Sequence, residues 1–100
     1  NRHPKTIWLE FKNVQGKKGW LNGEAEFISF DIAELGGFCV VRRQELKEWC
    51  VINVDSKFVD KEDAYKKLYQ RTDRKDVLTK IHLKDLEELK SYNLLKYATP

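Results

Sequence analysis

Short apolar runs separated by polar or glycine-containing stretches recur along the chain. The runs at residues 6–12, 38–41 and 77–81 are bounded by charged residues or glycines. Runs of this length and setting are typical of β-strands, either half-buried or fully buried. We therefore expect three strands here, the first of them leading into a glycine-containing loop.

Residues 23–35 fit two patterns. One set of apolar residues has helical spacing ahead of a Gly-Gly stop signal, and comprises Leu21, Ala25, Ile28, Ile32 and Leu35. Residues 26–32 also suit a strand, on which Glu26, Ile28, Phe30 and Ile32 would share one face. The sequence leaves both interpretations open.

Three further segments have the spacing of short helices. Residues 44–50 would turn Leu46, Trp49 and Cys50 inward, and residues 60–71 and 83–89 repeat apolar residues at intervals of three or four. The tail from Tyr92 would dock through Leu94, Leu95 and Tyr97. Helices that follow strands in this way predict an α/β (α+β) fold, with a mixed central sheet and short flanking helices.

Length and composition indicate one folded domain over residues 1–100. The chain has 100 residues, of which 41% are hydrophobic and 12% aromatic, enough for one modest core. It has no apolar run of membrane-spanning length and no secretory leader, so we expect no membrane partner and a cytoplasmic location. Cys39 and Cys50 form no zinc-binding pattern with the two histidines, and we expect two buried thiols rather than a disulfide. The first residue is Asn1 rather than methionine, which suggests cleavage, trimming of the chain or an N-terminal piece missing from the numbering.

The first strand carries a candidate chemical group, the pair Glu10 and Lys12. Alternate side chains of an extended chain share a face, so we expect both to point the same way as Trp8, with Leu9 and Phe11 opposite. A carboxylate can hold a hard divalent cation, and a nearby lysine can stabilise a phosphate or orient a water. The same spacing also fits an exposed ion pair worth about 0–1 kcal/mol.

Charge is unevenly spread along the first third of the chain. Residues 1–20 hold five basic residues and one acidic residue, whereas residues 21–36 hold four acidic residues and no basic ones. The loop at residues 15–19 has two lysines between two glycines and could approach a phosphate backbone closely. We expect the flanking Trp8 and Trp20 to be core anchors rather than stacking platforms.

Residues 8–28, with Glu10-Phe11-Lys12 near their start, resemble a stretch of small bacteriophage proteins in the PD-(D/E)XK nuclease superfamily. Residues 40–46, 69–71, 74–76 and 81–89 are similar to later parts of the same proteins. The resemblance implies a restriction-endonuclease-like fold and Mg²⁺- or Mn²⁺-dependent hydrolysis of phosphodiester bonds in DNA, in a bacterial host cell.

Two alignments with the superfamily pattern, an aspartate on one strand and acid-x-Lys on the next, are open. In the first, Glu10 and Lys12 are the catalytic pair, Glu10 binds the metal, and Glu24 or Glu26 assists; Glu26 is the second metal ligand we assign. No aspartate precedes Glu10. In the second alignment the aspartate and the acid-x-Lys lie upstream of Asn1, and Glu10 is a supporting acid.

Three classes of function follow from these observations. The first is the metal-dependent endonuclease, with a homodimer as the arrangement that would cut both strands. The second is a catalytically inactive nucleic-acid-binding module, and the third is a small protein-binding inhibitor. The residues expected to contact nucleic-acid phosphates are Lys17, Lys18, Arg42, Arg43, Arg71, Arg74 and Lys75.

Overall fold

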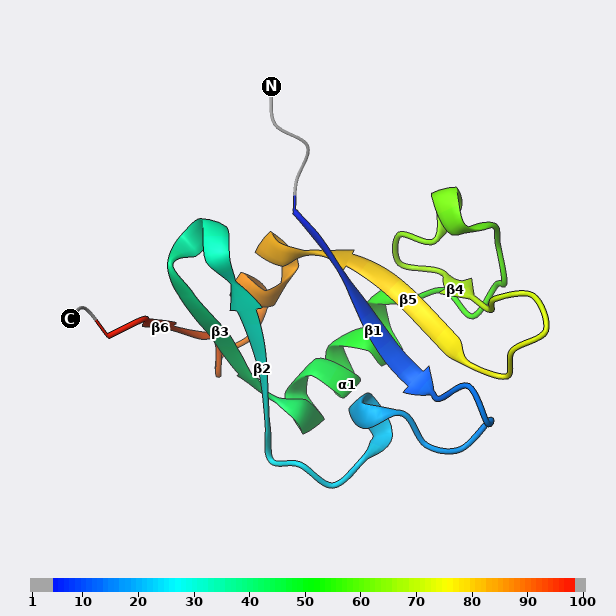
Figure 1. The fold of residues 1–100 in the computed structure, drawn as a ribbon, viewed down its shortest axis with the longest axis horizontal. Helices are drawn as coiled ribbons and strands as arrows, with labels where there is room; N and C mark the ends of the chain where they lie inside the picture. The colour runs from blue at the N-terminus through cyan, green and yellow to red at the C-terminus, as the bar shows by residue number, and fades with distance from the viewer. Residues whose placement is uncertain (1–4, 99–100) are drawn as a thin grey trace.

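Two three-stranded antiparallel sheets form the body of the molecule (Figure 1). The computed structural model describes residues 5–98. Sheet A has the strand order β1 (Thr6–Lys12), β5 (Val77–His82), β4 (Leu68–Tyr69). Sheet B has the order β2 (Phe27–Ile32), β3 (Gly37–Arg42), β6 (Asn93–Lys96). The predicted α+β class is confirmed, with two antiparallel sheets in place of one mixed sheet, and the restriction-endonuclease-like topology stays a prediction.

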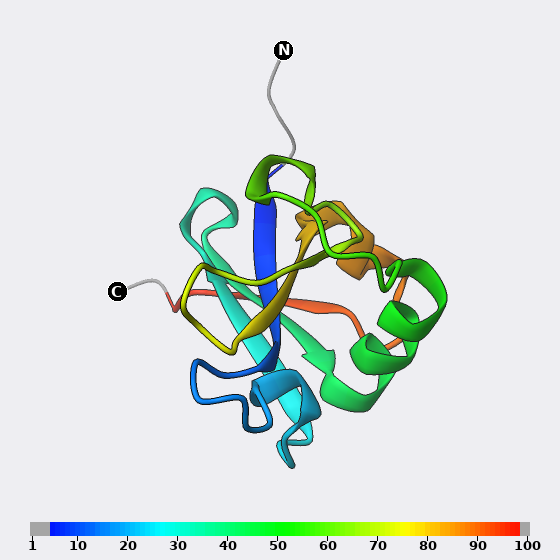
Figure 2. The same cartoon turned by 90° about the vertical axis from the view of Figure 1, so that its right-hand side faces the viewer.

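Sheet A has an inner face on the core and an outer face turned away from the helix. Leu9 pairs with Thr79 and Ile7 with Ile81, and the side chains of Leu9, Thr79 and Ile81 are fully buried. In Figure 1 helix α1 (Arg43–Asn53) lies behind β1 and β5, and the quarter turn of Figure 2 shows it to one side of them. The neighbouring positions Trp8 and Lys80 therefore project from the outer face.

Sheet B settles the two interpretations of residues 23–35 in favour of the strand. Residues 27–32 pair with β3 from Phe27↔Arg42 to Ile32↔Gly37, and Gly36 turns between them with φ +67°. No helix forms here because pairing with β3 satisfies the backbone N–H and C=O groups that a helix would otherwise pair internally. On the other edge of β3, a Cβ at Gly37 would lie 2.3 Å from the carbonyl oxygen of Leu95, so β6 packs against a glycine.

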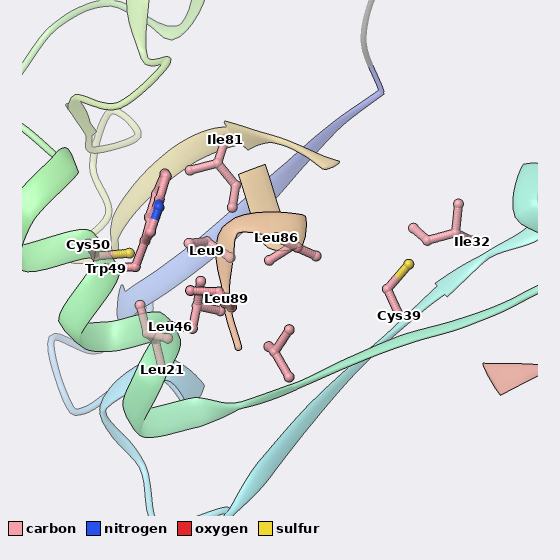
Figure 3. Packing of buried hydrophobic residues seen from close by; sticks show 11 residues of the cluster. Leu9, Leu21, Ile32, Cys39, Leu46, Trp49, Cys50, Ile81, Leu86 and Leu89 are labelled. Carbon is pink, nitrogen blue, oxygen red and sulfur yellow. The ribbon is translucent and has the colours of Figure 1, made fainter. Parts of the chain in front are cut away.

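Helix α1 buries the three residues that its spacing predicts, Leu46, Trp49 and Cys50. They meet the inner face of sheet A, the short 3₁₀ helix η1 (Trp20–Asn22) and residues of sheet B (Figure 3). The core residues are Leu9, Leu21, Ile32, Cys39, Val41, Leu46, Trp49, Cys50, Ile81, Leu86 and Leu89. Their contacts join both sheets and the helix into one core.

The helix predicted at residues 60–71 is wrong. This segment holds only the 3₁₀ turn η3 (Lys61–Asp63) and the strand β4, with Lys66 in the left-handed region at φ 57°. A residue with positive φ ends a right-handed helix, and Leu68 instead pairs with Thr79 of β5. In the segment between η3 and β4, the ring of Tyr65 stacks on that of His82 with centroids 4.0 Å apart.

The helix predicted at residues 83–89 is a 3₁₀ helix, η4 (Leu83–Glu88). Its leucines recur at intervals of three, the period of a 3₁₀ helix, and Leu86 and Leu89 are buried. A carboxylate oxygen of Asp85 accepts a hydrogen bond from the backbone N–H of His82 at 2.9 Å and fixes the first turn. The tail that follows docks as β6.

Both cysteines are free and buried, as the sequence predicts. Burial raises the pKa of the Cys50 thiol to about 12, so this thiol is protonated and unreactive at neutral pH. The two other 3₁₀ turns of the fold are η1 and η2 (Ala33–Leu35). None of the helices in residues 5–98 has the length and apolar character needed to cross a bilayer.

Candidate nucleic-acid interface

The predicted catalytic pair lies at the end of β1, where the strand contains a β-bulge. Glu10 pairs with Leu78 and Lys12 pairs with Val77, so Phe11 is an extra residue in β1. Leu78 and Val77 are neighbours on β5 and point to opposite faces of sheet A. The expectation that Glu10 and Lys12 share a face is therefore wrong, because the bulge interrupts the alternation on which it relied.

The two side chains have different surroundings. Glu10 lies on the outer face, where a Cβ at Gly19 would come within 2.7 Å of its Cγ atom, so the glycine lets the loop pass directly over this residue. Lys12 is exposed and borders an apolar cavity of about 400 Å³ on the helix side, together with Phe11, Val77 and Lys47. The carboxylate of Glu10 and the ammonium of Lys12 therefore lie on opposite faces of sheet A.

The two assigned metal ligands, Glu10 and Glu26, lie on different segments of the structure. Glu10 belongs to β1 of sheet A, whereas Glu26 lies just before β2 of sheet B. Glu26 forms an ion pair with Arg42 at 2.8 Å. Residues 5–98 contain no group of three or more His, Cys, Asp or Glu side chains placed to hold a metal ion.

The loop after β1 is built by a short set of hydrogen bonds. The side-chain oxygen of Asn13 accepts from the backbone N–H groups of Gln15 (3.0 Å) and Lys17 (3.1 Å). The backbone N–H of Asn13 donates to the carbonyl of Lys17 at 2.8 Å, and Gly16 supplies the positive φ of +80° that the turn requires. These contacts leave the Lys17 and Lys18 side chains exposed at the end of sheet A.

The loop between β4 and β5 lies against this first loop. The backbone N–H of Lys75 donates to the carbonyl of Val14 at 3.3 Å. The aliphatic part of the Lys75 side chain packs on Gly16, where a Cβ would lie 3.3 Å from its Cβ and Cδ atoms. Two loops distant in sequence, together with the end of β1, thus bring five exposed basic residues to one end of the sheet. We call this set, which comprises Lys12, Lys17, Lys18, Arg74 and Lys75, the basic end of sheet A.

The other three predicted phosphate contacts have partners within the protein. Arg42 pairs with Glu26. Arg43 donates to the carbonyl oxygens of Ala25 (2.7 Å) and Leu21 (3.1 Å), which fixes η1 and the entry to β2. Arg71 pairs through Nε with Asp76 at 2.7 Å, although its side chain is 47% exposed. Arg42 and Arg43 therefore stabilise the fold, whereas the guanidinium of Arg71 still has free N–H donors within residues 5–98.

The prediction that Trp8 and Trp20 are core anchors is correct for one of the two. Trp20 packs against the core and makes an edge contact with Phe30. Trp8 projects from the outer face of sheet A, where it contacts Tyr69. Strand alternation was the available signal, because Leu9 on the buried face puts Trp8 on the other one.

The sequence interpretation missed the residues around Trp8. Tyr69, Lys61 and Lys80 all lie near it on the outer face of sheet A. Lys80 could have been assigned to this face from the alternation along residues 77–82, but Lys61 and Tyr69 depend on the pairing of β4 with β5. Comparisons with family models, with curated proteins and with solved structures found no match to this chain.

Proposed function

We propose that the protein binds nucleic acid through the basic end of sheet A. The observation that carries this proposal is the contact between two separate loops, through Lys75 and Val14, which gathers lysine and arginine side chains on one surface. None of the five residues of the basic end makes an ion pair within residues 5–98. Unpaired, exposed cations at this density favour a polyanionic partner.

The phosphate backbone is the part of the ligand that this surface suits. Lysine side chains are flexible point charges that contact phosphates without reading base sequence. Neutralising each phosphate releases counterions, so affinity falls linearly with salt on a logarithmic scale. We therefore expect binding with little sequence preference and a strong dependence on salt concentration.

The test is the affinity of the protein for a labelled DNA duplex, measured by fluorescence anisotropy over a series of salt concentrations. Replacing both loop lysines, Lys17→Ala with Lys18→Ala, should weaken binding at low salt and lower the salt slope by about 2, because each phosphate contact contributes about 0.9. The matched control is Lys84→Ala with Lys90→Ala, which removes two exposed lysines outside the basic end. The control should keep the wild-type slope.

An equal loss of affinity in both double variants would overturn the assignment of the basic end, since net charge alone would then explain binding. Wild-type protein that binds no nucleic acid at low salt would overturn the function itself. The protein-binding inhibitor would then be the better hypothesis.

Metal-dependent hydrolysis of DNA is the second candidate. It is supported by the resemblance to PD-(D/E)XK nucleases and by one contact, in which the loop that carries Lys17 and Lys18 passes over Glu10 through Gly19. The described residues do not supply a full set of metal ligands, so we derive no catalytic step from them.

Plasmid cleavage distinguishes this candidate from binding alone. If the chain is a nuclease of this type, Mg²⁺ or Mn²⁺ supports nicking of supercoiled DNA, and Glu10→Gln and Lys12→Ala each abolish it while the circular dichroism spectrum stays unchanged. Glu48→Gln, on the exposed side of α1, is the matched control. Full activity in both variants would refute the assignment of this pair, and DNA retardation that chelators do not affect would favour binding alone.

A further inference from the structure

The outer face of sheet A carries two aromatic rings outside the core. Trp8 of β1 and Tyr69 of β4 are both partly exposed, with ring centroids 5.7 Å apart and planes inclined by 43°. Helix α1 covers the opposite face of this sheet (Figures 1 and 2). The two rings are therefore in contact with each other, and each leaves part of its surface open to solvent.

A cavity of about 200 Å³ lies beside this pair of rings. It is lined by Trp8, Tyr69, Leu78, Lys61 and Arg71. Cavities that hold drug-sized ligands are larger, about 300–1,000 Å³. The size and the aromatic walls together suit one planar ring.

Three basic side chains lie in or beside the cavity, and the Glu10 carboxylate lies on the same face next to the lining residue Leu78. Lys61 and Arg71 belong to its lining, and the ammonium of Lys80 lies 5.5 Å from the centroid of the Trp8 ring. The lining contains no carboxylate. A ligand that combines a flat ring with an adjacent negative charge matches this arrangement, and a nucleotide has both.

We propose that this cavity holds a base of single-stranded nucleic acid in contact with the rings of both Trp8 and Tyr69, with the neighbouring phosphates on Lys61, Lys80 and Arg71. The inference rests on the proposed function and specifies its ligand. Arg71 lies in the loop between β4 and β5 that also carries Arg74 and Lys75, so a strand bound at the cavity would continue onto the basic end of sheet A.

A duplex gains nothing from the aromatic rings. Its bases are stacked on each other and do not present their faces to a protein, whereas single strands can place a base on an aromatic side chain. The cavity should therefore add affinity for single strands alone, and the basic end should add affinity for both forms.

The experiment compares a labelled oligo(dT) with a duplex of equal length, by anisotropy at one low salt concentration. Tyr69→Ala and Trp8→Ala should each weaken oligo(dT) binding by roughly tenfold, as expected for the loss of one stacked base. Both should leave duplex binding unchanged, and Trp8→Phe should restore most of the single-strand affinity. Phe38→Ala, an exposed aromatic of sheet B that contacts Tyr97, is the matched control and should alter neither affinity.

Tyr69→Ala keeps the test decisive if Trp8→Ala does not fold, because Tyr69 lies on the short edge strand β4. Wild-type affinity for oligo(dT) in Tyr69→Ala, or equal losses for oligo(dT) and duplex, would overturn this inference and leave the proposed function standing. Wild-type protein that binds neither ligand would overturn both.

Discussion

Asp76 is a fully buried carboxylate at the start of β5. One of its oxygens accepts from Arg71 Nε at 2.7 Å, and the other, Oδ1, has no hydrogen-bond partner within residues 5–98. A buried charge with a single partner depends strongly on that partner. Arg71 thus stabilises the loop that carries the basic end, in addition to lining the outer cavity.

Arg71→Ala should lower the free energy of unfolding by about 1–3 kcal/mol, because it leaves the Asp76 carboxylate buried without compensation. Arg74→Ala, an exposed residue three positions away, should change it by less than about 0.5 kcal/mol. Urea unfolding followed by tryptophan fluorescence measures both. Equal stabilities of wild type and Arg71→Ala would show that Asp76 does not depend on this ion pair.

At the same scale, the expectation that Glu10 and Lys12 share a face is wrong for a local reason. Residue types and spacing identified two charged groups near the basic loop. Spacing predicts which side chains share a face only if the strand is regular. One extra residue at Phe11 reverses the face of everything that follows it. No residue in this stretch, such as a glycine or proline, marks the bulge in advance.

At the scale of elements, the first turn of α1 is joined to the segment that leads into β6. The Glu45 carboxylate accepts from the backbone N–H groups of Lys90 (2.7 Å) and Ser91 (2.9 Å), and from the Ser91 hydroxyl. The hydroxyl contact and these backbone hydrogen bonds lower the pKa of Glu45 below its usual value, against the opposing effect of burial. This contact fixes the segment that leads into β6, and β6 is the strand that pairs with the second edge of β3.

Glu45→Gln should lower the free energy of unfolding at pH 7 by about 1 kcal/mol, because hydrogen bonds to a charged group are lost. The folded-state pKa lies below the unfolded one, so this stabilisation is present above the unfolded value and is lost as pH falls through the folded one. Thermal unfolding from pH 7 to pH 3 should therefore show the gap between wild type and variant closing in acid.

Glu48→Gln is the control on the same helix, where the carboxylate contacts only the side chain of Gln44 within the described residues. It should follow the wild type at every pH. A gap that stays constant for Glu45→Gln across this range would mean that the carboxylate charge contributes nothing to the contact.

Elements with strong local signals were predictable, and elements made by distant pairing were not. The structure confirms the strands near residues 6–12, 38–41 and 77–81 and the helix at 44–50. Each has the apolar spacing that burial of one face requires, so its sequence alone predicts it. Residues 60–71 have helical spacing, yet the short strand within them exists only because β5 offers an open edge. Tertiary pairing of this kind overrides a weak local preference.

At the scale of the whole molecule, the charge split in the sequence does not become one site. The early acidic residues Glu26 and Glu34 form exposed ion pairs with Arg42 and Lys5. The basic residues of the first loop instead meet Lys75 from the other half of the chain. The sequence predicted most of these cations individually, but the surface on which they gather depends on how β1 and β5 align.

The hydrogen bonds around Asn13 have an energetic consequence for this surface. The loop backbone is held at both ends, by Asn13 and by the bond from Gly19 N–H to the Phe11 carbonyl at 2.9 Å. A partner would immobilise lysine side chains without having to freeze a mobile main chain, whose ordering costs about 1–2 kcal/mol per residue. Association would then carry a small conformational entropy penalty and proceed without a slow folding step.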